Sequence, residues 1–283
     1  MRSSVTIAGS ATALLGLLVR PVTADAETVY VTPHASYSSS VGVLGCKINT
    51  DRVAYWPAEV DCNNLCVSLS YGGRSLYLLR IDHSGGAHDV SYDAWNYLLT
   101  GKSATEDPIA GGATAMTTET VDMANCADLL HAKADGKTAL PLSASNSMNY
   151  LNSCLEQQAA GNDSWVAQHY ALFNIADPLC LYGYDEPCSL DDWPSQNQAT
   201  CHHALGAAAT LSDATPVYNI EYPSGTRVLA GGAAVPASSS TASASKSTAA
   251  ANNAAASSAV VLVASWTAVG LASLVHSLVA GFL

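Results

Sequence analysis

Cysteine content is the feature that most constrains the fold of this chain. All eight cysteines lie between residues 46 and 201 of the 283-residue sequence, which leaves both ends free of them. An even number of cysteines in an exported chain predicts up to four disulfides, but the sequence does not choose among the many pairings. The predicted disulfide residues are Cys46, Cys62, Cys66, Cys126, Cys154, Cys180, Cys188 and Cys201.

Zinc is the alternative use of these cysteines. Cys62 and Cys66 are four positions apart, and the run Cys201-His202-His203 adds two further residues of ligand type. Tetrahedral zinc sites are typically built from paired short spacings, which this chain lacks. The sequence therefore favours disulfides and predicts neither a metal nor a cofactor.

The first 26 residues are typical of a secretory signal peptide. Arg2 supplies the positive charge, a short apolar run extends from Val5 to Val19, and Ala24-Asp25-Ala26 has the pattern of a cleavage site. The apolar run is too short to span a membrane. We therefore expect the chain to be exported, with an extracellular domain over residues 27–230.

The other end has the composition of a glycosylphosphatidylinositol (GPI) signal. Residues 231–258 form a stalk rich in Ser and Ala, and residues 259–283 are apolar with no basic residue after them. A small-residue attachment site, a polar spacer and an apolar tail direct replacement of the tail by a GPI lipid. Asn252 or Asn253 is the predicted attachment residue, and Ser245 or Ser247 is the alternative with a longer spacer. A single membrane span is the alternative, and either anchor places the protein at the cell surface.

Charge and a glycosylation motif limit the partners. The formal net charge is −12 and no basic run is present, which argues against nucleic-acid binding. Asn162-Asp163-Ser164 is an N-glycosylation motif, and it is equally consistent with the cap of a helix.

The pattern of apolar residues predicts a mainly β fold with a helical insertion, an α+β class. Strands are expected over residues 29–84, with a hairpin turn at Gly72-Gly73. A helix is expected from Ser91 to Gly101 with Trp95 on its buried face. Further predicted elements are helices over residues 117–133, 144–158 and 164–174 and a strand over 216–222.

The arrangement expected from this order is a β-barrel completed by its last strand after an insertion. The insertion covers residues 103–215, is helical and contains cysteines. A β domain followed by a separate small helical domain is the alternative.

One segment carries a family resemblance. Between Cys62 and Leu98, a strand ends in Arg80-Ile81-Asp82, a Gly-rich loop follows, and the next element reads Ala87-His88-Asp89-Val90-Ser91, with Ala94-Trp95 after it. This segment resembles the RlpA, barwin and expansin group. Ala35-Ser-Tyr37 to Gly45-Cys46 is similar to that group's opening strand. The chain departs from the pattern with Ser84 for a cysteine, Ala87 for a histidine and His88 for a phenylalanine.

The resemblance implies a disulfide-bonded, six-stranded double-psi β-barrel. It also implies roles for Asp89, which matches the catalytic acid of related glycosidases and is retained in expansins, and for Asp82, which matches a second groove residue. The residues themselves agree, since two carboxylates across a cleft are what glycosidic hydrolysis requires. Asp89 can instead favour the start of the following helix through its charge.

Aromatic and histidine residues near the motif are candidates for sugar binding: Trp56, Tyr55, His88 and Tyr92. Three functions follow as expectations. The first is a surface protein that binds or remodels cell-wall polysaccharide without cutting it. The second is a glycoside hydrolase or lytic enzyme with Asp89 as general acid. The third is a structural wall protein or effector without carbohydrate activity.

Overall fold

A computed structural model describes residues 26–231 of the chain. Residues 1–25 of the predicted signal peptide lie outside this range. So do residues 232–283, which hold nearly all of the predicted stalk, the apolar tail and the attachment candidates Asn252 and Asn253. Between residues 26 and 231, no helix combines the length and the apolar character that a membrane crossing requires.

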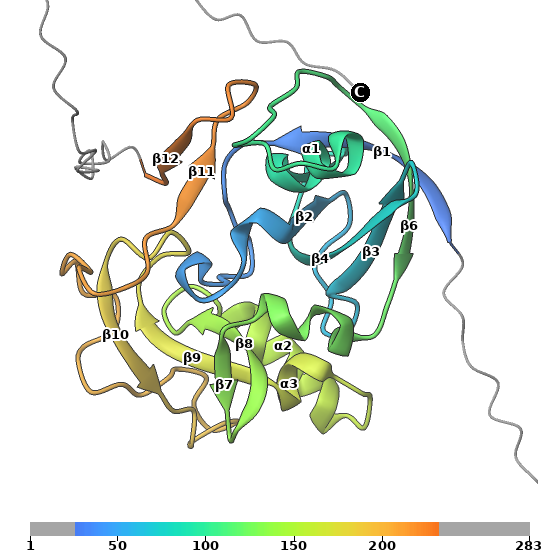
Figure 1. Ribbon diagram of the computed structural model, residues 1–283. Coiled ribbons are helices and arrows are strands. Elements are labelled where there is room, and N and C mark those ends of the chain that lie inside the picture. Colours follow the sequence, from blue (N-terminus) through green and yellow to red (C-terminus); the bar gives the residue numbers. More distant parts are fainter. Residues whose placement is uncertain (1–25, 232–283) are drawn as a thin grey trace, which may run out of the picture. The chain divides into compact units, whose positions relative to one another are not determined.

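Six strands close into a barrel, in the order β1-β5-β2-β4-β3-β6 (Figure 1). This confirms the prediction of a mainly β, six-stranded barrel. The pairs β1/β5 and β2/β4 are parallel, and the other four pairs are antiparallel. The strands are β1 (Glu27–His34), β2 (Val53–Trp56), β3 (Cys66–Tyr71), β4 (Arg74–His83), β5 (His88–Ser91) and β6 (Thr114–Thr120).

The barrel interior forms one apolar core because alternate residues of each strand point inward. Helix α1 (Tyr92–Thr100) adds its apolar side to this core, with Trp95 fully buried as predicted. The helix follows Ser91 and ends at Gly101, whose left-handed backbone (φ 83°) suits a glycine. Ser91 does not cap the helix with its side chain; its hydroxyl donates to the carbonyl of Asp51 at 2.6 Å. The barrel core comprises Val29, Val31, Ala54, Trp56, Val67, Leu69, Leu78, Val90, Tyr92, Ala94, Trp95, Leu98, Ala104, Met116 and Ile220.

The predicted hairpin is confirmed. Strands β3 and β4 pair from Cys66 opposite Leu79 to Tyr71 opposite Arg74, so Gly72 and Gly73 form a two-residue turn. Both glycines have positive φ values, 57° and 78°, which is the backbone that such a turn requires.

The helix predicted over residues 117–133 is wrong. Residues 114–120 form β6, which pairs with β1 and β3 and closes the barrel; a short 3-10 helix, η3 (Met123–Leu129), and strand β7 (Ala132–Ala134) follow. Val121, Cys126, Leu129 and Leu130 gave a helical spacing, but the Thr-rich run before them has the β-branched side chains that strands favour.

The predicted position of the last barrel strand is also wrong. Tyr218–Ile220 does form a strand, β11, but it pairs with β12 (Arg227–Leu229) in a separate two-stranded sheet. The barrel is complete by residue 120, and its last strand, β6, lies inside the segment 103–215 that was expected to interrupt it.

A second, four-stranded sheet follows the barrel in the order β10-β9-β8-β7. It contains β8 (Lys137–Ser143), β9 (Tyr170–Ile175) and β10 (Gly183–Cys188). Helix α2 (Met148–Ala159) confirms the helix predicted over residues 144–158 but begins later. Only Trp165–Gln168 (α3) of the predicted helix 164–174 is helical, because the alternating residues from Tyr170 onward form β9.

A second apolar core joins the barrel to this sheet. The outward residues of β2 and β4, among them Val53, Leu79 and Ile81, belong to the same buried cluster as Leu140 of β8 and Ile175 of β9. Strand β2 and residues 78–82 of β4 are therefore largely buried on both faces, which explains why these stretches are nearly continuous in apolar residues.

All eight cysteines form disulfides, as predicted, and the structure gives the pairing. The bonds are Cys46–Cys180, Cys62–Cys154, Cys66–Cys126 and Cys188–Cys201. The first three connect the segment up to residue 66 with the part of the chain after the barrel, and the fourth closes a short loop. Zinc binding through Cys62, Cys66 or Cys201 is excluded because none of them is a free thiolate.

Candidate functional site

The two predicted carboxylates lie in one row across neighbouring strands. Tyr55 of β2 is the register partner of Asp82 on β4 and of Asp89 on β5. Two strand spacings place the Cα atoms of Asp82 and Asp89 about 10 Å apart. Tyr55 occupies the position between them, and its side chain is buried.

The Asp82 carboxylate holds a loop in place through hydrogen bonds. It is 8% exposed, and its carboxylate accepts hydrogen bonds from the Ser38 hydroxyl (2.6 Å) and from the backbone N–H groups of Ser40 (2.9 Å) and His83 (2.8 Å). A carboxylate with three donors around it and little solvent contact anchors the chain between β1 and β2. It has little capacity left to act on a substrate.

Asp89 is the more accessible of the two. It is partly exposed, and one of its oxygens accepts a hydrogen bond from the hydroxyl of Thr32, its register partner on β1. Among the described residues its other oxygen has no donor. One carboxylate oxygen is thus left open at the surface of the barrel.

Burial and three nearby carboxylates raise the pKa of the Tyr55 phenol. Burial raises the pKa of its phenol well above the ordinary value. The charges of Asp82, Asp51 and Asp89 raise that pKa further, so the phenol stays protonated at all ordinary pH values. The centroid of the His34 ring lies 4.5 Å from that of the Tyr55 ring. The His34 ring therefore occupies the space beside the row formed by Asp82, Tyr55 and Asp89.

Asp51 is a titratable residue near this row that the sequence analysis missed. Burial and the neighbouring Asp93 carboxylate raise the pKa of Asp51, against the opposing charges of Arg52 and Arg227. Asp93 itself is buried and pairs with the Arg52 guanidinium at 2.7 Å. No sequence signal marks Asp51, because its position follows only from how α1 packs beside the short 3-10 helix η2 (Thr50–Arg52).

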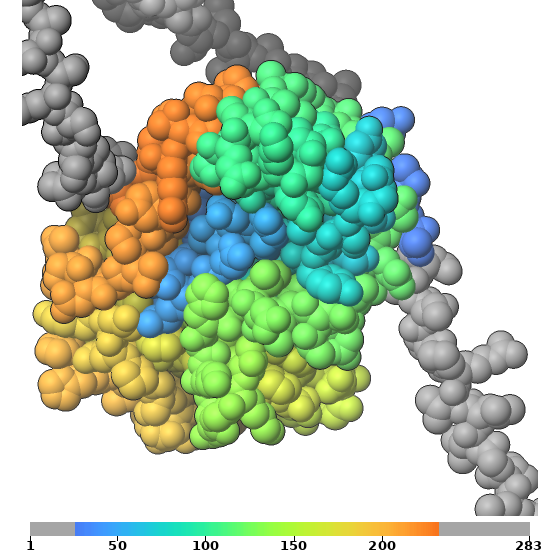
Figure 2. Space-filling model, in the orientation of Figure 1, coloured from blue at the N-terminus to red at the C-terminus, as the bar shows by residue number. Residues whose placement is uncertain are grey.

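Asp51 lines a narrow pocket beside the row. The pocket lies where three segments meet, and Figure 2 shows these segments side by side: the blue early segment, the green segment with α1, and the orange segment with β11. Its free volume of about 10 Å³ is room for one water molecule and not for a sugar ring. The lining includes His34, Asp51, Tyr55, Tyr92 and Tyr218.

The aromatic residues predicted for sugar binding are mostly buried. Trp56 is 8% exposed, Tyr55 3% and Tyr92 1%. The Tyr92 hydroxyl donates to the carbonyl of Ile109 at 2.8 Å, which satisfies its polar end inside the protein. These rings contribute to the core and leave little face for a ligand.

His88 lies at the edge of the barrel interior beside Trp56. The two ring centroids are 5.2 Å apart in an edge-on arrangement. Burial lowers the pKa of His88 and the charge of Arg80 lowers it further, while Glu27 and Asp89 act in the opposite direction. His88 is therefore largely neutral at pH 7, and it is only partly exposed.

The exposed aromatic residues are ones that the motif search did not select. Tyr30 on β1 is 68% exposed and Tyr77 on β4 is 44% exposed. Both belong to the outward face of the antiparallel strands β1, β6, β3 and β4, which we call the tyrosine face. The outward residues of these strands that are exposed or half-buried include, besides the tyrosines, small side chains and one acid: Thr28, Ser68, Ser70, Ser75, Ala115, Thr117 and Glu119.

The extent of the tyrosine face follows from the strand register. Tyr30 lies opposite Ala115, and Tyr77 lies opposite Ser68, which in turn lies opposite Glu119. Three strand spacings and four residues along β6 separate the two tyrosines, roughly 20 Å when measured along the curved wall of the closed barrel. In the sequence of β6, polar residues alternate with buried ones, and this pattern is typical of a strand with one face exposed to solvent.

Asn162 is exposed in the turn between α2 and α3. Ser164, two residues later, is the cap of α3: its hydroxyl accepts a hydrogen bond from the N–H of Ala167 at 3.1 Å. The capping interpretation therefore holds for Ser164, and the Asn162 side chain remains accessible.

No protein-family model matches the sequence, and no curated protein matches it.

Proposed function

We propose that this protein is an extracellular, GPI-anchored cell-wall protein that binds polysaccharide without hydrolysing it. The proposal includes a double-psi barrel of the RlpA, barwin and expansin type, which the closed six-stranded barrel with two parallel strand pairs supports. Four disulfides support an oxidising, extracellular environment.

The tyrosine face is the observation that carries the binding proposal. Sugar rings present apolar faces that stack on aromatic rings, and their hydroxyls hydrogen-bond to Ser, Thr and acidic side chains. Tyr30 and Tyr77 provide two such rings on the polar outer wall of the barrel, on strands that lie three places apart in its ring of six.

The carboxylate row supports binding in preference to hydrolysis. Acid-base cleavage needs two available carboxyl groups facing the scissile bond. Only Asp89 is accessible, since Asp82 is occupied by the loop that it holds, and the pocket beside the row is too small for a sugar.

Co-sedimentation of the protein with insoluble glucan, chitin and whole cell walls tests the proposal. We expect the wild type to sediment with at least one of them and the double variant Tyr30→Ser/Tyr77→Ser to remain in solution. Tyr182→Ser is the matched control, because Tyr182 is similarly exposed (47%) but lies outside the barrel. Failure of the wild type to bind any of these materials would refute the proposal and favour the structural or effector function.

Sugar release measured in the same samples tests the hydrolytic alternative. We expect no soluble sugar from the wild type or from Asp89→Asn. Release by the wild type that is lost in Asp89→Asn would instead identify an enzyme with Asp89 as its acid.

A further inference from the structure

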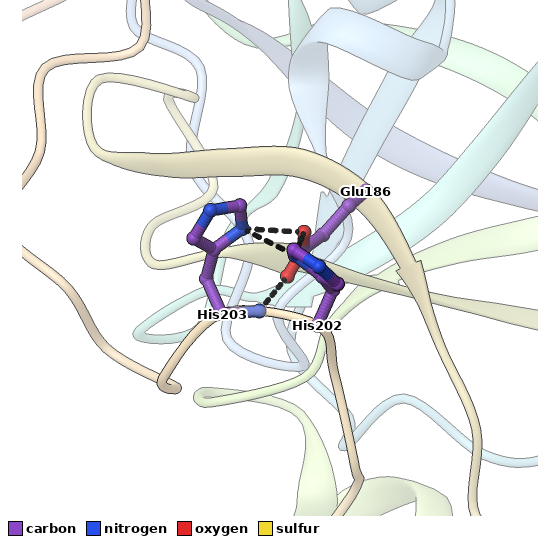
Figure 3. A group of neighbouring side chains, drawn as sticks. All are labelled: Glu186, His202 and His203. Atoms are coloured by element: carbon purple, nitrogen blue, oxygen red, sulfur yellow. Dashed lines mark hydrogen bonds and ion pairs between the residues drawn. The ribbon is translucent and has the colours of Figure 1, made fainter.

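Three side chains of ligand type converge outside the barrel. Glu186 lies on β10, and His202 and His203 follow the end of the loop that leads away from this strand (Figure 3). The Nδ1 atoms of the two histidines are 3.3 Å apart. Glu186 Oε2 lies 2.7 Å from His203 Nδ1 and 3.8 Å from His202 Nδ1.

The separation of the two histidine nitrogens fits a shared metal ion, and a small movement of the Glu186 carboxylate would replace its hydrogen bond to His203 by a bond to that ion. Two imidazole nitrogens bound to one tetrahedral ion at about 2.0–2.1 Å lie about 3.3 Å from each other. The two Nδ1 atoms already have this separation, so an ion could bind both without a change in the backbone.

The Glu186 carboxylate is held in the required orientation. Its Oε1 atom accepts hydrogen bonds from the side chain of Asn174 (2.8 Å) and the backbone N–H of His203 (2.7 Å), which leaves Oε2 directed at the two rings. Burial raises the pKa of this carboxyl, but these hydrogen bonds and the His203 ring lower it to about 2 overall.

Asn174 links the parts of the cluster. It is 2% exposed, and its amide also donates to the carbonyl of His203 at 3.0 Å. One buried amide therefore fixes both the acid and the histidine segment. Groups that orient ligands in this way are a regular component of protein metal sites.

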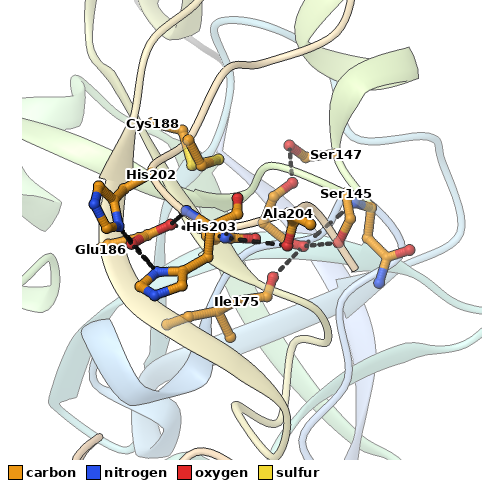
Figure 4. Close-up of a disulfide and its surroundings, with 12 residues drawn as sticks. Ser145, Ser147, Ile175, Glu186, Cys188, His202, His203 and Ala204 are labelled. Atoms are coloured by element: carbon orange, nitrogen blue, oxygen red, sulfur yellow. Dashed lines mark hydrogen bonds and ion pairs between the residues drawn. A yellow bond between two sulfur atoms is a disulfide. The ribbon is translucent and has the colours of Figure 1, made fainter. Parts of the chain in front are cut away.

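A disulfide holds the two ends of the cluster together. Cys188, two residues after Glu186, is bonded to Cys201, which directly precedes His202 (Figure 4). Beside it, Ser189 and Thr200 exchange two backbone hydrogen bonds of 2.8 Å. The intervening loop can vary without separating the acid from the histidines.

The His203 ring has a further contact that fixes its plane. It stacks on Tyr184, with ring centroids 3.9 Å apart and planes 11° from parallel. A ring held by stacking loses little further freedom on binding an ion.

We propose that Glu186, His202 and His203 bind a divalent transition-metal ion, with Zn²⁺ as the best-fitting ion. Two imidazole nitrogens and one carboxylate oxygen suit zinc, whereas calcium and magnesium require oxygen ligands throughout. A three-residue ligand set leaves the fourth position open. His202 is 83% exposed, so this position faces solvent and can accept a water molecule or a group from another molecule.

This site is independent of the proposed polysaccharide binding. It lies on the second sheet and its loop, whereas the tyrosine face belongs to the barrel.

Metal content and competition measurements on the full chain without a polyhistidine tag test this inference. The protein is stripped with a chelator, loaded with ZnCl₂, dialysed and analysed for zinc by mass spectrometry. A chromophoric zinc chelator then gives the affinity, and excess calcium tests selectivity. We expect one zinc per wild-type chain that calcium does not displace.

Three variants locate the ion. His203→Ala and Glu186→Gln should weaken zinc binding by at least about tenfold. His131→Ala is the matched control, because His131 is exposed and lies outside the cluster, and it should bind like the wild type. Thermal unfolding without metal verifies that all variants are folded. Wild-type protein that retains no zinc, or binding by Glu186→Gln and His203→Ala that is as tight as that of the wild type, would overturn the inference.

Discussion

The four disulfides differ in the length of chain that they close, and their contributions to stability should differ accordingly. Cys188–Cys201 spans 13 residues, whereas Cys46–Cys180 spans 134. In the chain-entropy treatment these loops give about 3 and about 5 kcal/mol of stabilisation at 25 °C. We therefore expect Cys188→Ala/Cys201→Ala to lose about 3 kcal/mol and Cys46→Ala/Cys180→Ala to lose more.

Burial widens this difference. Cys46 and Cys180 are 8% and 6% exposed and belong to the core between the barrel and the second sheet, so their truncation also leaves a cavity. Cys188 and Cys201 are only partly buried at the edge of that core. The long-loop variant should therefore lose at least about 5 kcal/mol in free energy of unfolding.

Urea unfolding of the oxidised proteins, followed by tryptophan fluorescence and far-UV circular dichroism, measures both losses. Thermal midpoints should fall by about 6–12 °C for the short-loop variant, since 1 kcal/mol corresponds to about 2–4 °C at this size. An equal or larger loss for the short-loop variant would refute the reasoning, because it would mean that native-state contacts at Cys188 and Cys201 outweigh loop entropy. The wild type under the same conditions is the reference.

Three other predictions concern single residues. Burial raises the pKa of Asp51 above its unfolded value, so ionisation of Asp51 destabilises the fold as pH rises through the folded pKa. Asp51→Asn should therefore unfold at a higher temperature than the wild type at pH 7 and at the same temperature near pH 3. A Cβ atom at Gly111 would lie 2.5 Å from the buried Trp95 ring, so Gly111→Ala should cost about 1–3 kcal/mol in urea unfolding, whereas Gly112→Ala, with open space around it, should be neutral. Protein made in a secreting eukaryotic host should shift to lower mass with peptide N-glycosidase, and Asn162→Gln should abolish that shift; an unchanged shift in the variant would contradict it.

Local sequence signals predicted the parts of the fold that depend on local geometry. The Gly72-Gly73 turn and the helix between Ser91 and Gly101 were both found, because a positive φ value at a glycine is a property of one position. The same holds for Trp95, whose place on the buried side of the helix follows from helical periodicity.

Barrel closure could not be predicted in this way. Whether Thr114–Thr120 or Tyr218–Ile220 completes the barrel depends on pairing with β1, about ninety residues or more away in the sequence, and neither strand carries a mark of its partner. The Thr-rich alternation of β6 favours a strand, whereas the apolar spacing that follows it favours a helix. The strand signal was the correct one.

The carboxylate row and the Glu186 cluster could not be predicted completely for the same reason. Asp82 and Asp89 were selected by a motif, but only the structure shows that one holds a loop while the other stays accessible. His202 and His203 stood out beside Cys201, yet their acidic neighbour Glu186 is brought to them by a disulfide whose pairing the sequence leaves open. Contacts between distant segments, not residue types, were the missing information.

The disulfide pairing also determines what happens while the chain is being made. Cys46, Cys62 and Cys66 are synthesised first, and each is bonded to a cysteine that comes later: Cys180, Cys154 and Cys126. At about 5–20 residues per second, the 60 residues between Cys66 and Cys126 take about 3–12 seconds to synthesise. Throughout that interval the three thiols can react only with one another or with other molecules. Production of the native protein therefore depends on a compartment that can reverse wrong bonds, and a host poor in disulfide isomerase should accumulate chains cross-linked among these three cysteines.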